Sequence, residues 1–227
     1  MKAGSPLLSF AYENVIDEIC ALNWCGLTSQ ELTEAAWAYY FFSIQFRENL
    51  QIACKFYPDD LSLRKLDEEE RATSNLSPWP GVAKPGEKMD HDEFMRRLLL
   101  LSPDAICSRS TLEQFGRSYL QEIREMSPQT RAISIASYEG GGLERVFRAF
   151  LTSPAWDGAL LQAFRHFLVE HIRFDSDPEQ GHGVLSRQLA PDDRILPLWV
   201  EFKTLLVLAV PSLQVETPEV VQRSASA

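Results

Sequence analysis

Apolar residues recur at helical spacing along almost the whole chain, and this pattern is the strongest constraint on the fold. Between positions 8 and 22 they lie three or four residues apart, as on one face of a helix. A second segment begins at Thr28, a typical helix N-cap with Glu31 three residues later, and runs through WAYYFFSIQF to about Tyr57. Strand-like alternation is missing, so the sequence predicts an all-α protein.

Prolines, glycines and serines divide the remaining chain into further helices. The acidic stretch 67–71 leads into SNLSPWPGVAKPGE, residues 74–87, whose prolines and glycines exclude regular helix and predict a long loop. Helical spacing returns over 87–101, 110–126, 128–138, 143–152, 156–175 and about 194–209. We therefore expect seven or eight helices of mixed length in an irregular bundle, with functional residues projecting inward.

Length and composition indicate one domain with a substantial core. The 227 residues are 45% apolar and include five Trp and thirteen Phe, which is unlike a disordered chain. We assign residues 1–211 to a single domain and residues 212–227 to a flexible tail. The formal charge of −10 argues against DNA, RNA or an anionic membrane surface as a partner.

The N-terminal residues and the cysteines favour a cytoplasmic protein. Acidic residues follow soon after Met1, which is unlike a signal peptide, and no apolar run approaches the roughly 20 residues that span a bilayer. The four cysteines form no C-x-x-C pair, so we expect them to be reduced and mostly buried.

The stretch EHIRFDSDPEQGHGVL, residues 170–185, carries a possible metal site. On a continuous helix His171, Asp175 and His182 would fall within roughly 40° of one another, although Pro178 predicts a kink or break between them. Two imidazoles and a carboxylate suit iron, manganese or zinc, and carboxylate-rich surroundings favour iron or manganese. The alternative is a solvated helix end whose histidines are incidental.

Two further segments supply similar groups. EKMDHDEF places Glu87 and His91 four residues apart on one helix face, where they could share a metal. The alternative is an acid-rich first turn that favours the helix dipole. Glu139 is followed by three glycines, which predict a helix break where the backbone passes close to another group, or else a simple loop.

Together these segments offer three histidines and three carboxylates from three helical regions, which is the composition of a two-iron carboxylate site. A ferritin-like arrangement needs two E-x-x-H motifs on separate helices. The chain has that spacing only at Glu179 and His182, beside a proline, so ferritin-like architecture ranks second.

The order of these motifs resembles the haem-oxygenase-like diiron oxidases and oxygenases. The resemblance is carried by IASYEGGGLERVFRAFL, AFRHFLVEHIRFDSD and GHGVL, and more weakly by FRENLQIACKFYPDDL and MDHDEF. It implies a haem-oxygenase-like bundle of helices. It also implies two Fe(II) per chain, with Glu139 and Asp175 as catalytic carboxylates among the metal ligands Glu87, His91, Glu139, His171, Asp175 and His182. Glu87 enters this set as a substitute, because GVAKPG stands where the family has a Glu-rich segment.

The same resemblance implies activation of O₂ at a diferrous centre for desaturation, N-oxygenation, or oxidative rearrangement or cleavage, commonly in natural-product biosynthesis. We expect a small amino acid as substrate, since its carboxylate needs a cation and Arg47, Arg165 and Arg173 are candidates. Each of these arginines has the alternative of an ordinary surface side chain. A homodimer is compatible with the sequence.

Two other classes stay open. A metal-free enzyme of the same fold would keep the helices without converging histidines. A non-catalytic helical interaction protein would lack an enclosed polar pocket. His166 lies about 140° around its helix from His171, so we expect it to have a structural role.

Overall fold

The computed structural model describes residues 10–71, 79–87, 89–101, 109–175, 186 and 188–214, excepting the side chains of Phe174 and Asp175. Within these residues every regular element is helical, which confirms the all-α prediction. The α-helices are α1 Ala11–Cys20, α2 Ser29–Phe56, α3 Leu61–Glu70, α4 His91–Leu99, α5 Arg109–Glu125, α6 Pro128–Ser137, α7 Leu143–Phe150, α8 Gly158–Asp175 and α10 Leu196–Ala209. Shorter helical turns are η1 Trp24–Gly26, η2 Tyr138–Gly142, η3 Asp193–Ile195 and η4 Pro211–Leu213.

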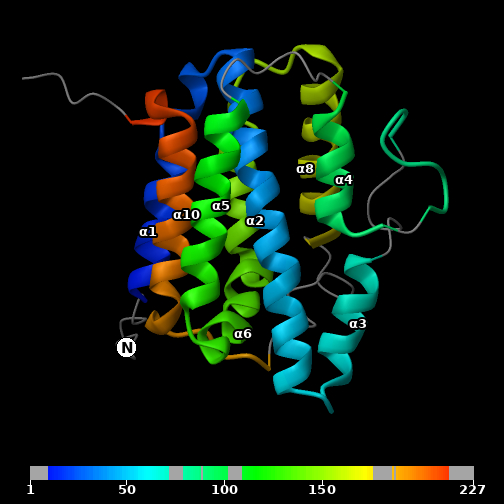
Figure 1. Ribbon diagram of the computed structural model, residues 1–227, viewed down its shortest axis with the longest axis vertical. Coiled ribbons are helices and arrows are strands. Elements are labelled where there is room, and N and C mark those ends of the chain that lie inside the picture. The colour runs from blue at the N-terminus through cyan, green and yellow to red at the C-terminus, as the bar shows by residue number, and fades with distance from the viewer. Residues whose placement is uncertain are drawn as a thin grey trace, which may run out of the picture.

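The long helix α2 is the central element of the bundle. Its start was predicted correctly: Thr28 Oγ1 accepts a hydrogen bond from the Glu31 backbone N–H, and the Glu31 carboxylate accepts one from the Thr28 N–H. Figure 1 shows α1, α10 and α5 on one side of α2, and α3, α4 and α8 on the other. Because the apolar residues of α2 surround it on several sides, α2 can pack against both groups of helices.

Aromatic rings fill much of the core. Phe42 of α2 lies 4.3 Å from Phe202 of α10 between ring centroids, and Trp24 lies 4.3 Å from Phe150 of α7. The first contact joins α2 to α10 and the second joins η1 to α7, so both connect elements that lie far apart in the sequence. Large side chains of this kind bury extensive apolar area, so they contribute strongly to the stability of the bundle.

Two helix boundaries differ from the sequence prediction. Helix α3 was not predicted, although Asp60 caps it by accepting hydrogen bonds from the backbone N–H groups of Ser62 and Leu63. Helix α4 begins at His91 and not at residue 87, because the chain turns at Gly86, whose φ is +73°. Glu87 therefore precedes the helix and does not share a helical face with His91.

The C-terminal boundary also differs. Leu213 is fully buried, and its carbonyl accepts a hydrogen bond from the Asn23 backbone N–H. Packing thus continues past residue 211, and the rest of the predicted tail, 215–227, lies outside the described residues.

The exposure of the cysteines and the hydropathy of the helices can also be compared with the sequence predictions. Cys20, Cys25 and Cys54 are free thiols, but Cys25 is exposed and the other two are only partly buried, so the expectation of mostly buried cysteines is wrong for the described ones. Cys107 lies outside the described residues. Among the helices that the structure describes, none has the length and apolar character needed to cross a membrane.

Candidate functional site

A pocket lies between α2, α3, α4, α8 and the turn η2 that joins α6 to α7. Together with the open solvent at its mouth, it spans about 560 Å³. One face of α2 contributes aromatic, apolar and basic side chains, whereas the other elements contribute most of the acids and both histidines. The lining residues are Tyr39, Ser43, Phe46, Arg47, Leu50, Asp67, Glu70, Arg71, Asp90, His91, Asp92, Glu139, Leu143, Phe147 and His171.

His91, the first residue of α4, contacts a carboxylate that the sequence prediction missed. Its Nδ1 lies 2.7 Å from Oε2 of Glu70, the last residue of α3. Both residues are at least nine-tenths buried. An imidazole and a carboxylate buried together must share a proton or a cation, since an isolated buried charge is costly.

His171 of α8 also contacts His91. Its Nε2 lies 3.2 Å from His91 Nδ1. Its Nδ1 lies 2.8 Å from the backbone carbonyl oxygen of Phe167, one turn earlier in the helix. A carbonyl oxygen can only accept, so Nδ1 of His171 carries a hydrogen and the ring is held in one orientation.

The contacts of this cluster determine where its protons lie. With Glu70 ionised, Nδ1 of His91 carries the hydrogen that the carboxylate accepts. His171 then presents a lone pair at Nε2 toward the same nitrogen. Within the described residues the buried Nε2 of His91 has no hydrogen-bond partner, so it presents a second lone pair. The cluster is thus a set of nitrogen and oxygen donors of the kind that bind transition metals.

Glu139 enters the pocket from the turn η2, which is a π-helical interruption of the α6–α7 segment. Such interruptions are common at functional sites. Gly141 has a φ of +103°, a conformation that glycine adopts without strain. At Gly142 a Cβ atom would lie 2.4 Å from the Ser137 carbonyl oxygen and 2.9 Å from the Trp199 ring. The predicted helix break with a close backbone approach is therefore confirmed.

A buried hydrogen-bond chain lies beside Glu139. Tyr119 donates to Gln45 Oε1 at 2.8 Å, and Gln45 Nε2 donates to the Tyr138 hydroxyl at 3.2 Å. Burial raises the pKa of Tyr138 to about 12, so the hydroxyl is protonated at neutral pH. Since Tyr138 directly precedes Glu139, this chain anchors the turn that carries the carboxylate.

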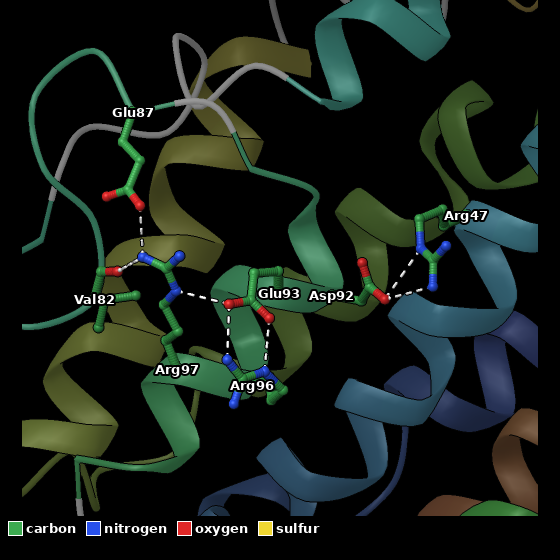
Figure 2. A network of polar contacts seen from close by, with 7 residues as sticks. All are labelled: Arg47, Val82, Glu87, Asp92, Glu93, Arg96 and Arg97. Carbon is green, nitrogen blue, oxygen red and sulfur yellow. Dashed lines mark hydrogen bonds and ion pairs between the residues drawn. The ribbon is translucent and has the colours of Figure 1, made fainter.

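Glu87 is not brought to the pocket, contrary to the expectation from its spacing. Its carboxylate accepts hydrogen bonds from the Lys84 backbone N–H and from Arg97. Figure 2 shows Glu87 joined through Arg97 to Glu93, away from the Arg47–Asp92 pair. These bonds lower the pKa of Glu87, the backbone bond from Lys84 contributing most. The carboxylate that contacts His91 belongs instead to Glu70, on the helix that precedes the predicted loop.

The remaining predicted ligands are only partly described. Asp175 is the last residue of α8, but its side chain lies outside the described residues, as does the whole of His182. Within the described part of the chain, no group of three or more His, Cys, Asp or Glu side chains forms a metal-binding arrangement. The structure nevertheless brings Glu139, His91 and His171 to one pocket, where Glu70 takes the place that was predicted for Glu87.

Of the three candidate arginines, only Arg47 lines the pocket. Its Nε and Nη2 donate to Asp92 Oδ2 at 3.1 and 2.8 Å. Burial acts to lower the pKa of Arg47, but the hydrogen bond and the nearby charges of Asp92, Asp90 and Glu48 outweigh it and raise the pKa. Arg165 is exposed, and the side chain of Arg173 is 81% exposed and pairs weakly with Glu170. His166, expected to be structural, lies 4.9 Å from the Trp79 ring.

Glu70 was the residue that the sequence interpretation missed. The stretch DEEE, residues 67–70, reads as a solvated acidic run. However, Leu63, Leu66 and Glu70 follow one another at spacings of three and four, and all three are buried. That short amphipathic pattern after the cap residue Asp60 was the available signal.

Comparisons of the chain with protein-family models, with curated proteins and with solved structures each found no match.

Proposed function

We propose that the protein is an O₂-activating non-haem diiron oxidoreductase that acts on a small amino acid in the cytoplasm, in natural-product biosynthesis. The observation that carries this proposal is the cluster of Glu70, His91 and His171, which lines one pocket with Glu139. These four residues come from four different segments of the bundle.

The contact distances fit adjacent ligands of one metal ion. Two ligands at right angles around an ion, with bonds of about 2.1 Å, lie about 3 Å apart. The Glu70–His91 and His91–His171 separations of 2.7 and 3.2 Å bracket this value, so His91 would bind through Nδ1 once its hydrogen has moved from Nδ1 to Nε2. Glu70, His91, Glu139 and His171 would hold iron together with Asp175 and His182.

The surrounding residues would prepare this donor set before iron binds. The Phe167 carbonyl fixes the His171 ring and leaves Nε2 deprotonated. A backbone carbonyl is a usual outer-shell partner of a metal-binding histidine. Rings of Phe147 and Phe167 lie 5.7 and 4.1 Å from the His171 ring and keep water from that side. Bound ferrous iron would supply the electrons for O₂ activation.

A metal-free enzyme is the second candidate, and one specific contact favours it. Glu70 and His91 hydrogen-bond directly, as the carboxylate and imidazole of a general acid–base pair do. Such an enzyme would use the His91–His171 contact to relay a proton and would have no requirement for iron.

Anaerobic titration of the apoprotein with Fe(II) distinguishes the two candidates. We expect two irons per chain, followed on exposure to O₂ and free amino acids by a transient visible band and consumption of one amino acid. The His171→Ala, Asp175→Ala double variant is the control for specific binding. Wild-type Fe(II) binding no stronger than that of this variant contradicts the diiron proposal and favours the acid–base alternative.

A further inference from the structure

The mouth of the pocket carries charged groups that the proposed iron site does not use. Arg47, Asp90 and Asp92 line it, as do Asp67 and Arg71 of α3. Arg71 and Asp90 also line a more open depression beside the pocket, which marks this side as the entrance.

Arg47 is oriented and only partly occupied. Asp92 accepts hydrogen bonds from Nε and Nη2, and both bonds end on one oxygen, Oδ2. Within the described residues, Nη1 of Arg47 makes no hydrogen bond. A guanidinium held in this way presents its remaining N–H groups to a second carboxylate, for which its planar fork is well suited.

Asp90 supplies the opposite charge next to Arg47. It precedes α4 as the N-cap residue, but its side chain makes no capping hydrogen bond. In the described part of the chain it also forms no ion pair, although its charge acts on Arg47. The half-buried carboxylate is thus available to accept hydrogen bonds from an ammonium group.

Beyond these charges the pocket wall is apolar. Phe46 and Leu50 of α2 and Leu143 and Phe147 of α7 line it. His91, which is 8% exposed and has an unpartnered Nε2, lies in the same lining. The pocket thus combines opposite charges, apolar side chains and a set of donor atoms.

We propose that this pocket binds an α-amino acid as its zwitterion, with the carboxylate on Arg47, the ammonium on Asp90 and an apolar side chain along Phe46, Leu50 and Phe147. This assignment rests on the proposed function, because it takes the substrate pocket to be the one lined by His91 and His171. A simple amine would leave the free N–H groups of Arg47 unused, and a fatty acid would leave the half-buried Asp90 carboxylate without an ammonium partner.

The test is binding, measured by isothermal titration calorimetry on the full-length protein with each of the common L-amino acids. The tightest ligand is then compared with its two truncated analogues. For L-leucine these are 4-methylpentanoate, which lacks the ammonium, and 3-methylbutylamine, which lacks the carboxylate. We expect each analogue to bind about 10- to 100-fold more weakly, since each loses one charge-assisted contact.

Variants assign each contact to a residue. Arg47→Gln should weaken binding of the amino acid about 10- to 100-fold but leave binding of the amine analogue unchanged. Asp90→Asn should also weaken binding of the amino acid about 10- to 100-fold, but leave binding of the carboxylic acid analogue unchanged. Arg96→Gln is the matched control, because Arg96 is an exposed arginine of α4 that pairs with Glu93. Circular dichroism and the Fe(II) stoichiometry of each variant establish that the fold and metal site are intact.

The outcomes separate this inference from the proposed function. Binding of two Fe(II) with no selective amino acid binding, or with equal binding of an analogue, overturns the inference and the choice of an amino acid substrate, and leaves the proposed diiron centre standing. Selective amino acid binding that depends on Arg47 and Asp90, with no specific Fe(II) binding, supports the inference and overturns the diiron proposal. Selective binding that Arg47→Gln and Asp90→Asn leave unchanged also overturns the inference.

Discussion

Nε2 of His171 lies 3.2 Å from Nδ1 of His91, across the contact between α8 and α4. The two residues are 80 positions apart in the sequence. Because the Phe167 carbonyl already fixes the hydrogen on His171 Nδ1, the facing nitrogens need a proton or a cation between them. This requirement makes the pair a candidate for chemistry and not only for packing.

Glu70, and not Glu87, should contribute to metal binding. Replacing Glu70 with Gln keeps the shape of the side chain but removes a charged donor beside His91. We expect Fe(II) affinity to fall by at least about tenfold, since even residues that only orient ligands are worth about 10- to 100-fold. Anaerobic Fe(II) titration measures the change.

Glu87→Gln is the matched control for that experiment. Glu87 pairs with Arg97 outside the pocket, so its replacement should leave Fe(II) affinity unchanged. If Fe(II) affinity falls in Glu87→Gln but not in Glu70→Gln, then Glu87, as predicted from the sequence, is the metal ligand and Glu70 is not.

The sequence predicted those parts of the fold that depend on local chemistry. Thr28 and Glu31 form the expected capping box, and Gly142 marks the expected close approach. Helix α3 was missed because its sequence is short and acidic, and only Leu63 and Leu66 suggest a buried face before Glu70. Glu87 was predicted instead because it lies four residues before His91, a spacing that places two residues on one face only if the helix extends back to Glu87.

Contacts between distant segments could not be read from local patterns. Spacing identified His91, Glu139 and His171 as candidates, and all three line one pocket. Their side-chain partners depend on how α3, α4 and α8 pack around α2, which is decided by shape complementarity across the core. The pairing of Arg47 with Asp92 has the same origin, and no spacing rule relates those two residues.

The hydroxyl of Tyr138 should stabilise the fold. Tyr138→Phe keeps the ring contacts with Phe42 and Trp199 but leaves Gln45 Nε2 without its buried acceptor. We expect the free energy of unfolding to fall by about 1–3 kcal/mol, measured by urea denaturation at pH 7. Tyr57→Phe, at an exposed position, should change it by less than about 0.5 kcal/mol. Equal effects of the two substitutions would contradict a role for the hydroxyl.

The three glycines after Glu139 should differ in their tolerance of alanine. Gly142→Ala places a Cβ atom against the Ser137 carbonyl oxygen and the Trp199 ring. We expect it to lower the free energy of unfolding by about 1–3 kcal/mol, as overpacking does. Gly140→Ala meets nothing within 4 Å and has an ordinary φ of −73°, so it should be neutral or slightly stabilising. Thermal unfolding compares the two variants, and similar losses in both would exclude steric clash as the reason for Gly142.

The ion pairs of Glu93 should make stability depend on acid pH. The pKa of Glu93 is lowered from 4.5 to about 2, chiefly by the hydrogen bond from Arg96, with Arg97 adding to the effect against the opposing influence of burial. The folded-state pKa thus lies below the unfolded value. The resulting stabilisation is present above pH 4.5 and is lost as the pH falls toward 2. Because these side chains are partly exposed, we expect it to be worth less than about 1 kcal/mol.

Carbon-13 NMR of the Glu93 carboxyl group, combined with urea denaturation across this pH range, measures both quantities. Glu93→Gln should be less stable than the wild type at pH 6, and the difference should shrink as the pH approaches 2, where the wild-type carboxyl group also becomes protonated. Arg96→Gln should raise the pKa of Glu93, since it removes the largest stabilising contact of the carboxylate. An unchanged pKa in that variant would mean that the Arg96–Glu93 contacts of Figure 2 do not persist in solution.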